Sequence, residues 1–268
     1  MLDEPVADLE RRFGGLARLY GPAGAARIRA SHVVVVGIGG VGSWAVEALA
    51  RSGVARLTLI DLDHVSESNI NRQIHALDTT LGQAKVQAMR ERIAHINPLC
   101  DVVCIEEFVD ADNWLQLLPN NADAIIDACD QVRAKTAMAA WARQSKSIFI
   151  TVGAAGGKRY AHRVDIDDLS AATHDPLLAQ VRTRLRNEHG APRGATSGGK
   201  KIGVSCVFSR EAVMQPQLDT SAQDVAQDAT LNCHGYGSVV SVTATFGQCA
   251  AGWVLDKISL GATSMPAN

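Results

Sequence analysis

Residues 32–42, HVVVVGIGGVG, decide the fold of this chain. The four valines at 33–36 form a continuous β-branched run, which predicts a strand buried on both faces. The glycines that follow, Gly37, Gly39 and Gly42, match the spacing G-x-G-x-x-G, and Gly40 stands among them. Glycine allows a tight turn and a close approach of backbone N–H groups to a phosphate, and the helix N-terminus that follows attracts negative charge. The stretch therefore predicts a strand–turn–helix unit that holds a nucleotide.

Strand and helix patterns alternate along the first part of the chain. After the strand at 32–36, further strands are predicted at 56–61, 102–108, 124–129 and 147–153, and helices at 43–52, 82–96 and 132–144. Helices that alternate with strands connect parallel strands and cover both faces of their sheet. We therefore expect an α/β fold that is Rossmann-like, with a mostly parallel sheet, helices on both faces and an elaborated C-terminal half.

After residue 153 the regular alternation of strand and helix patterns ends. Strands are predicted at 162–169 and 201–209, a helix at 175–188, a long polar loop at 210–234 and a last helix from about 238 to 258. We expect one domain over residues 1–268, with a nucleotide-binding part at about 30–153 and a substrate and interface part at about 154–268.

Composition excludes several classes of protein. The 268 residues carry a formal net charge of −2, so no global basic excess implies nonspecific nucleic-acid binding. The six cysteines form no CxxC pair, which argues against a zinc site and a disulfide framework. The N-terminal segment is acidic and polar, unlike an export signal, so we expect a cytoplasmic protein with reduced thiols. Residues 235–255 carry no charge, but their Gly, Ser and Thr content favours a buried or dimer-interface helix over a membrane span.

A polar set after the second predicted strand separates ATP from NAD. Asp61 ends that strand, where a carboxylate can accept hydrogen bonds from ribose hydroxyls. Beyond it stand Asn69, Arg72, Gln73 and Lys85, although a dehydrogenase needs no polyphosphate clamp at this point. Arg72 can hold phosphate oxygens in a bidentate fork, and Lys85 supplies a compact charge. Lys85 is expected in the first turn of its helix, where a cation opposes the helix dipole unless an anion compensates.

Two aspartates follow the strand predicted at 124–129. Asp127 and Asp130 lie at the carboxyl end of that strand, which is the usual ligand edge of a parallel sheet. A carboxylate there can hold Mg²⁺ against the phosphates of ATP. Asp130 also precedes a predicted helix, so helix capping is the alternative role for it.

Together these motifs resemble the ThiF/MoeB group of ubiquitin-activating-enzyme-like adenylyltransferases. The shared pattern comprises G-x-G-G-x-G, D-x-D at 61–63, N-x-N-R-Q at 69–73, a lysine at 85 and D-x-x-D at 127–130. The resemblance implies the following roles: the glycine loop with Asp61 and Asp63 holds the adenosine, Asn69, Arg72, Gln73 and Lys85 bind the triphosphate, and Asp130 binds Mg²⁺. In this group a carboxylate attacks the α-phosphate of ATP to give an acyl-adenylate and pyrophosphate. Arg72, Lys85 and Asp130 are accordingly expected to be catalytic.

Four further stretches resemble the branch of this group that dehydrates N6-threonylcarbamoyladenosine in tRNA: RRFGGLARLYG (11–21), NRQIHAL (71–77), TVGAAGG (151–157) and GVSCVFSREA (203–212). That branch implies an ATP-driven cyclisation through a carboxyl-adenylate, with tRNA as substrate. It also implies a homodimer, a monovalent cation (Na⁺ or K⁺) as a further cofactor and a cysteine desulfurase or sulfur-acceptor system as a partner. The sulfur-carrier activators of the group usually have two CxxC pairs, and this chain has neither. Their N-terminal arginine falls on Gly15 here, and Arg18 is the nearest substitute.

A basic stretch in the second half is a candidate tRNA contact. Arg184, Arg186, Lys200 and Lys201 lie close together in the sequence, and tRNA binding requires cations that meet phosphates. An ordinary solvated helix face and loop is the alternative interpretation.

Two other functions remain open at this level. An activator of a ubiquitin-like sulfur carrier would adenylate a small protein that ends in Gly–Gly, whereas a plain Rossmann dehydrogenase would bind NAD and release no pyrophosphate. The cysteines Cys206 and Cys233 are interpreted as structural or incidental rather than catalytic, and Cys129 as a core residue.

Overall fold

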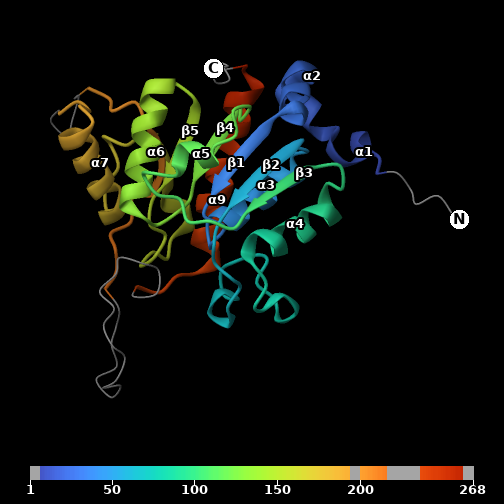
Figure 1. The fold of residues 1–268 in the computed structure, drawn as a ribbon, viewed down its shortest axis with the longest axis horizontal. Helices are drawn as coiled ribbons and strands as arrows, with labels where there is room; N and C mark the ends of the chain where they lie inside the picture. Colours follow the sequence, from blue (N-terminus) through green and yellow to red (C-terminus); the bar gives the residue numbers. More distant parts are fainter. Residues whose placement is uncertain (1–6, 194–199, 216–235, 262–268) are drawn as a thin grey trace, which may run out of the picture.

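The computed structural model describes residues 7–193, 200–215 and 236–261. Seven strands form one sheet in the order β3-β2-β1-β4-β5-β7-β6 (Figure 1). Their bounds are β1 His32–Val36, β2 Arg56–Ile60, β3 Asp101–Ile105, β4 Ala124–Asp127, β5 Ile148–Val152, β6 Val164–Asp168 and β7 Ser205–Ser209. Every neighbouring pair is parallel except β6 with β7, which is antiparallel. The predicted α/β fold with a mostly parallel sheet is confirmed.

Helices pack on both faces of this sheet and create two hydrophobic cores. The first core holds α2 (Gly15–Ala30), α3 (Gly42–Arg51), α4 (Lys85–Ile96) and α9 (Val240–Ser259). The second holds α5 (Trp114–Leu117), α6 (Val132–Ser145) and α7 (Pro176–Glu188). Successive strand residues point to opposite faces, so the valines of β1 divide between the two cores. Val33 and Val35 enter the first core, and Val34 and Val36 enter the second.

Several element bounds differ from the sequence prediction. The predicted strand at 102–108 ends early as β3, the helix expected at 82–96 begins only at Lys85, and the strand expected at 201–209 shortens to β7. The sequence predicted no helix before residue 32, yet α1 (Leu9–Phe13) and α2 lie there. Glycine and proline weaken the local helix signal, and α2 contains Gly21 at φ 72 followed by Pro22. Its packing against α9 supplies what local propensity lacks.

The last helix, α9, packs against α3 at close range. A Cβ atom at Gly247 would lie 2.3 Å from the carbonyl oxygen of Val41 and 2.8 Å from the amide nitrogen of Ala45. Glycine at this position therefore lets the α9 backbone contact the start of α3. Thus α9 is a core helix, as its composition suggested, and within the described ranges no helix is both long and apolar enough to cross a bilayer.

The polar loop predicted at 210–234 is described only in its first part. Residues 210–215 contain no helix or strand. The remainder, including Cys233, lies outside the described residues.

Candidate functional site

The glycine loop between β1 and α3 is shaped by two glycines that the fold itself requires. Gly37 has φ +84, and a Cβ there would lie 2.8 Å from the backbone of Ala128. A Cβ at Gly42 would lie 1.7 Å from the carbonyl oxygen of Gly37. Larger residues are excluded at both positions, and the predicted strand–turn–helix unit is present.

The other two glycines of the loop border an open pocket. The nearest atom to a Cβ at Gly39 would be the side-chain amide nitrogen of Gln73, at 4.0 Å. At Gly40 a Cβ would meet only side chains, the nearest being Arg72 at 3.2 Å. The pocket beyond them, here called the glycine-loop pocket, has a volume of about 200 Å³. Its lining includes the glycines Gly37, Gly39 and Gly40 and the polar residues Asp61, Asp63, Arg72, Gln73, Lys85, Glu107, Cys129, Asp130, Gln131 and Thr243.

Three helices start at this pocket without a side-chain cap. The N-cap residues of α3, α4 and α6 are Val41, Ala84 and Gln131, and none of them makes a capping hydrogen bond through its side chain. Helix N-termini carry partial positive charge and N–H groups that lack intrahelical partners. The arrangement favours an anionic ligand in the pocket.

Asp61 ties the glycine loop to the strand beside it. Its carboxylate accepts hydrogen bonds from the amide nitrogen of Ile38 at 2.5 Å and from that of Asp63 at 2.8 Å. Burial raises the pKa of Asp61, while Lys85 nearby acts in the opposite direction. The carboxylate therefore lies at the predicted place, at the end of β2, and holds the loop in shape.

Lys85 and Asp63 form an ion pair across the pocket wall. Lys85 begins α4, as predicted, and its Nζ lies 2.7 Å from a carboxylate oxygen of Asp63. The lysine side chain is 7% exposed and the aspartate 54% exposed. Asp63 thus supplies the negative charge that compensates Lys85, a cation at the positive N-terminal end of α4. A polyanionic ligand would compete with Asp63 for the same ammonium group.

Arg72 and Gln73 are buried side chains of the turn that precedes α4. Arg72 donates to the carbonyl oxygen of Ser68 at 2.7 Å and to the side chain of Asn71 at 2.8 Å. The Gln73 side-chain oxygen accepts no hydrogen bond from any residue that the structure describes. Both side chains line the pocket with Lys85, as the sequence predicted.

Asn69 has a different position from the one expected. Its side-chain oxygen accepts a hydrogen bond from the amide of Ser66 at 3.1 Å, within a 3-10 turn at Glu67–Asn69. It is buried and is not among the described residues that line the pocket. In this structure Asn69 supports the turn that presents Arg72 rather than lining the cavity.

The two aspartates after β4 separate into a buried and an exposed position. Asp127 is fully buried, 3.1 Å from Nζ of Lys135. Asp130 is exposed on the pocket lining and accepts a weak hydrogen bond from the Gln131 side chain at 3.4 Å. Gln131, not Asp130, occupies the N-cap position of the helix that follows, so the alternative capping role of Asp130 is not seen. Among the described residues no group of three or more His, Cys, Asp or Glu side chains could hold a metal ion.

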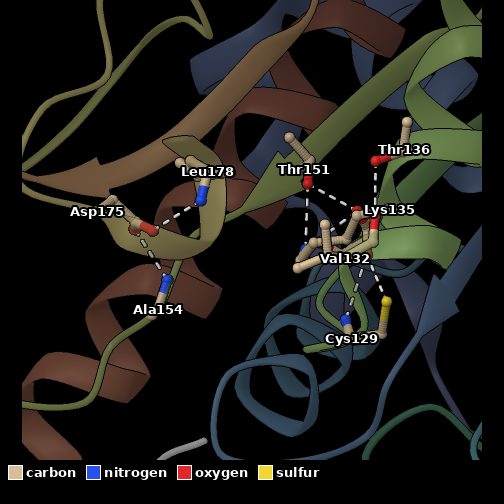
Figure 2. A network of polar contacts seen from close by, with 9 residues as sticks. Cys129, Val132, Lys135, Thr136, Thr151, Ala154, Asp175 and Leu178 are labelled. Carbon is tan, nitrogen blue, oxygen red and sulfur yellow. Dashed lines mark hydrogen bonds and ion pairs between the residues drawn. The ribbon is translucent and has the colours of Figure 1, made fainter. Parts of the chain in front are cut away.

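Lys135 is a buried charged residue behind the pocket wall that the sequence analysis missed. Figure 2 shows Lys135, Thr151 and Cys129 converging on the end of β4. The lysine Nζ lies 3.1 Å from the Thr151 hydroxyl, and that hydroxyl donates to Asp127 at 2.6 Å. Cys129 donates its backbone and thiol hydrogens to the same carboxylate, at 3.2 and 3.1 Å. The one signal in the sequence was the position of Lys135 in an Ala-rich helix next to D-x-x-D, because a lysine on an apolar face must find a partner.

Asp175 connects the second half of the chain to the same pocket. Its carboxylate caps α7 by accepting from the Leu178 amide at 2.9 Å and also accepts from the Ala154 amide at 2.9 Å (Figure 2). Burial raises the pKa of Asp175 despite these hydrogen bonds. The loop at 153–155 and Leu177 of α7 both line the pocket. The cap thus holds the start of α7 against the loop that follows β5.

The candidate substrate residues lie away from this pocket. Arg18 is exposed on α2, and Arg184 pairs with Glu188 at 3.2 Å. Arg186 donates to the carbonyl oxygen of Pro192 at 3.2 Å, and Lys200 and Lys201 are exposed after α7. None of these five is among the described lining residues of the pocket.

The described cysteines behave as structural residues. Cys206 is fully buried in β7, and burial raises the pKa of its thiol. Burial and the neighbouring Asp127 raise the pKa of Cys129 in the same way. Neither thiol is poised to be a nucleophile, since the thiolate is the reactive form.

The chain is similar in sequence and in structure to known proteins. The ThiF family profile matches residues 12–266. The tRNA threonylcarbamoyladenosine dehydratase of Haemophilus influenzae is 42% identical over 254 residues, which covers 94% of this chain and 95% of that protein. A crystal structure of Escherichia coli tRNA N6-threonylcarbamoyladenosine dehydratase, TcdA, with ATP has a TM-score of 0.84 at 42% identity, and covers 97% of this chain and 98% of that chain. The same enzyme with AMP has a TM-score of 0.84 and covers 97% and 99%.

Proposed function

The chain belongs to the ThiF family, and from this premise we propose that it dehydrates N6-threonylcarbamoyladenosine in tRNA at the expense of ATP. The observation that carries the proposal is the meeting of the glycine loop, Arg72, Lys85 and Asp130 around one pocket. Relatives of that name match this chain over nearly its whole length. ATP is the nucleotide, as in the matched complex, and the glycine loop with Asp61 and Asp63 holds its adenosine.

The first step is the adenylation of the substrate carboxylate. A carboxylate is a poor electrophile because its leaving group would be oxide, and transfer of AMP supplies a good leaving group. One carboxylate oxygen attacks the α-phosphorus, the bond to the bridging oxygen breaks, and pyrophosphate leaves. Arg72 and Lys85 stabilise the negative charge that develops on the phosphates. Lys85 is available for this after it exchanges Asp63 for the phosphate, because that aspartate is largely solvated.

Asp130 is suited to hold Mg²⁺ at the pocket rim. Its carboxylate is exposed on the lining and takes no part in capping α6. Mg²⁺ is usually bound by one or two carboxylates together with phosphate oxygens and water. When bound, the ion supplies charge neutralisation to the phosphates. Asn69 acts by positioning the Arg72 turn.

The second step is an intramolecular ring closure. The carbamoyl group of the modified adenosine attacks its own activated carboxyl carbon, the ring forms, and AMP leaves with one carboxylate oxygen. The lost hydrogen leaves as a proton, so the sum is the loss of one water driven by ATP. Intramolecular attack has a high effective molarity, and no enzymic nucleophile is required. The raised thiol pKa values of Cys129 and Cys206 agree with a mechanism that uses no thiolate nucleophile.

The partners are tRNA and a second copy of the chain. The tRNA contact is assigned to Arg184, Arg186, Lys200 and Lys201, and Arg18 is assigned to the dimer contact or the substrate. A monovalent cation and a cysteine desulfurase system are further proposals by family resemblance, as are a cytoplasmic location and a single domain over the whole chain. Adenylation of a ubiquitin-like sulfur carrier is the alternative reaction of the family, and no feature of the described residues favours it.

The test is a reconstituted reaction. The protein is incubated with ATP, Mg²⁺ and tRNA that carries the modified nucleoside, and the nucleosides are analysed by mass. We expect loss of one water, with AMP and pyrophosphate formed in equal amounts. Lys85→Met and Asp130→Asn should each lower kcat/KM by about 10²-fold or more, whereas the exposed Lys146→Met should not. ATP turnover that requires a Gly–Gly protein instead of tRNA would reject the proposal.

A further inference from the structure

A second cleft opens on the other side of α4, outside the glycine-loop pocket. Its volume is about 630 Å³, and it is bordered by α1, the last residue of α3, the C-terminal half of α4 and the segment from His75 to Thr80. It is here called the arginine cleft, after Arg12, Arg51 and Arg92 on its walls. The two cavities share no lining residue. None of the roles assigned so far uses this cleft.

Two of its arginines are held in place by one buried carboxylate. Glu47 is 4% exposed, and its oxygens accept from Nε of Arg51 at 2.7 Å and from Nε of Arg92 at 2.7 Å. Arg92 adds a second hydrogen bond to it at 3.1 Å. Arg51 contacts Glu47 through Nε, and its terminal amino groups make no hydrogen bond to any described residue. A guanidinium that is already oriented loses less conformational entropy when it binds a ligand.

The third arginine completes a convergent cationic wall. Arg12 donates to the carbonyl oxygen of Ile96 at 2.8 Å, at the C-terminal end of α4. Phe13 beside it packs on Gly53, which fixes α1 against the end of α3. The only carboxylate among the described lining residues is Glu91, which accepts from the Gln83 side chain at 2.7 Å. Three guanidinium groups against the carboxylates of Glu47 and Glu91 leave a positive excess in the cleft.

We propose that the arginine cleft is a phosphate-binding site, and that the phosphate belongs to the backbone of the tRNA substrate. Planar guanidinium groups can bind two phosphate oxygens at once. The described residues that line the cleft include no lysine. The same helix links the two cavities, since α4 carries Lys85 at its first residue and Arg92 two turns later. Along α4 the separation between these two residues is about 10 Å, at ~1.5 Å per residue. A strand of RNA whose modified nucleoside meets ATP at the mouth of the glycine-loop pocket spans that distance.

The assignment of the phosphate to tRNA rests on the proposed function, whereas phosphate binding by the arginine cleft does not. The key variant is the double substitution Arg12→Gln with Arg51→Gln, which leaves the Glu47–Arg92 pair intact. The matched control is Arg29→Gln with Arg56→Gln, which removes the same charge from ion pairs outside the cleft. Steady-state kinetics are measured with tRNA and with ATP at several salt concentrations.

We expect the cleft variant to raise the KM for tRNA about tenfold and to lower its salt slope by about two, one for each lost phosphate contact. The KM for ATP and the kcat should stay within twofold, and the control should behave as wild type. Unchanged KM and slope in a folded cleft variant would overturn the tRNA assignment.

A labelling experiment on the wild-type protein tests the cleft without relying on turnover. Phenylglyoxal modifies accessible arginines, and the labelled peptides are identified by mass. We expect tRNA to protect Arg12 and Arg51 but not Arg29. Protection by inorganic phosphate alone would support the phosphate chemistry and reject tRNA as its source. If neither tRNA nor inorganic phosphate protects Arg12 and Arg51, the inference is overturned. If tRNA protects these arginines but the wild-type protein does not dehydrate it, the result counts against the proposed function only.

Discussion

The glycines of the loop after β1 fall into two pairs, one packed against the protein backbone and one facing the cavity. Gly37 and Gly42 are required by the protein, because a Cβ at either would meet backbone atoms at 2.8 Å or less. Gly39 and Gly40 face the cavity, where a Cβ would meet side chains or open space. The protein's own backbone therefore does not require glycine at the latter pair, which leaves room there for the close approach of a ligand.

This division predicts opposite phenotypes for two alanine substitutions. Gly39→Ala should leave the free energy of unfolding within about 1 kcal/mol, since no protein atom blocks the methyl group, and should raise the KM for ATP at least tenfold. Gly42→Ala should destabilise the fold by several kcal/mol through the forced contact with the Gly37 carbonyl. Urea unfolding and ATP kinetics on both variants check this. Equal loss of stability in the two variants would contradict it.

His75 is a second residue whose environment has a measurable consequence. It is 2% exposed, and neither ring nitrogen has a partner among the described residues. Burial, with Lys85 and Arg92 nearby, lowers its pKa to about 3. The ring is therefore neutral in the folded state at neutral pH, while in the unfolded chain it takes up a proton near pH 6.5.

The expected effect is a loss of stability in mild acid. The His75 contribution is complete above the unfolded pKa, and it declines as the pH falls from there toward 3, because only the unfolded chain binds the proton. The slope is at most about 1.4 kcal/mol per pH unit. His75→Phe should flatten the pH dependence of the unfolding free energy between pH 6.5 and 4.5, whereas the exposed His162→Gln should not. An unchanged slope in His75→Phe would contradict the assignment.

At the scale of elements, the contact between α3 and α9 joins the core to the glycine loop. Val41 precedes α3, and its carbonyl lies against Gly247 of α9. The 20-residue helix α9 reaches the pocket through Thr243. Packing in the first core therefore helps to set the position of the loop that borders the pocket.

Two glycines of α9 make a matched pair for testing this contact. Gly247→Ala should destabilise the protein by about 1–3 kcal/mol, because the added methyl group overlaps α3, and should also raise the KM for ATP. Gly252 has no atom within 4 Å of its would-be Cβ, so Gly252→Ala should stabilise by up to about 1 kcal/mol through helix propensity. Urea unfolding of both variants measures the difference. A destabilised Gly252→Ala, or a neutral Gly247→Ala, would refute the packing argument.

At the scale of the whole molecule, the carboxyl ends of the parallel strands gather the chemistry at one edge. The glycine-loop pocket lies there, between the glycine loop and the loop that Asp175 holds. The basic residues of α7 and the arginine cleft belong to opposite faces of the sheet, since α7 packs in the second core while α3 and α4 pack in the first. A large substrate has two different cationic approaches to the pocket.

The α7 approach has its own test. Charge reversal at Arg184, Arg186 and Lys201 should raise the KM for tRNA several-fold and leave the KM for ATP unchanged, because each of these side chains lies outside the pocket lining. Arg184 and Arg186 already have partners within the protein, so the unfolding temperature of the triple variant is measured alongside. A KM for tRNA equal to that of wild type would remove α7 from the interface.

The strand–turn–helix unit, the α/β alternation and most of the pocket residues were predictable because short-range chemistry carries them. A β-branched run, glycine spacing and the charge of residues at strand ends depend on neighbours in the sequence. Even the compensation of Lys85 by an anion could be anticipated from the helix dipole, and Asp63 supplies it. The helices before β1 escaped prediction because Gly21 and Pro22 weaken the local signal that packing on α9 replaces.

Tertiary structure alone decided which of two similar aspartates reaches the pocket. Asp127 faces Lys135 in the core while Asp130 faces outward, and Asn69 turns away to support its own loop. The arginine cleft was equally invisible, because residues 12, 51 and 92 meet only after α1, α3 and α4 have packed. Sequence patterns encode local conformation and burial, whereas the convergence of distant side chains depends on how whole elements pack.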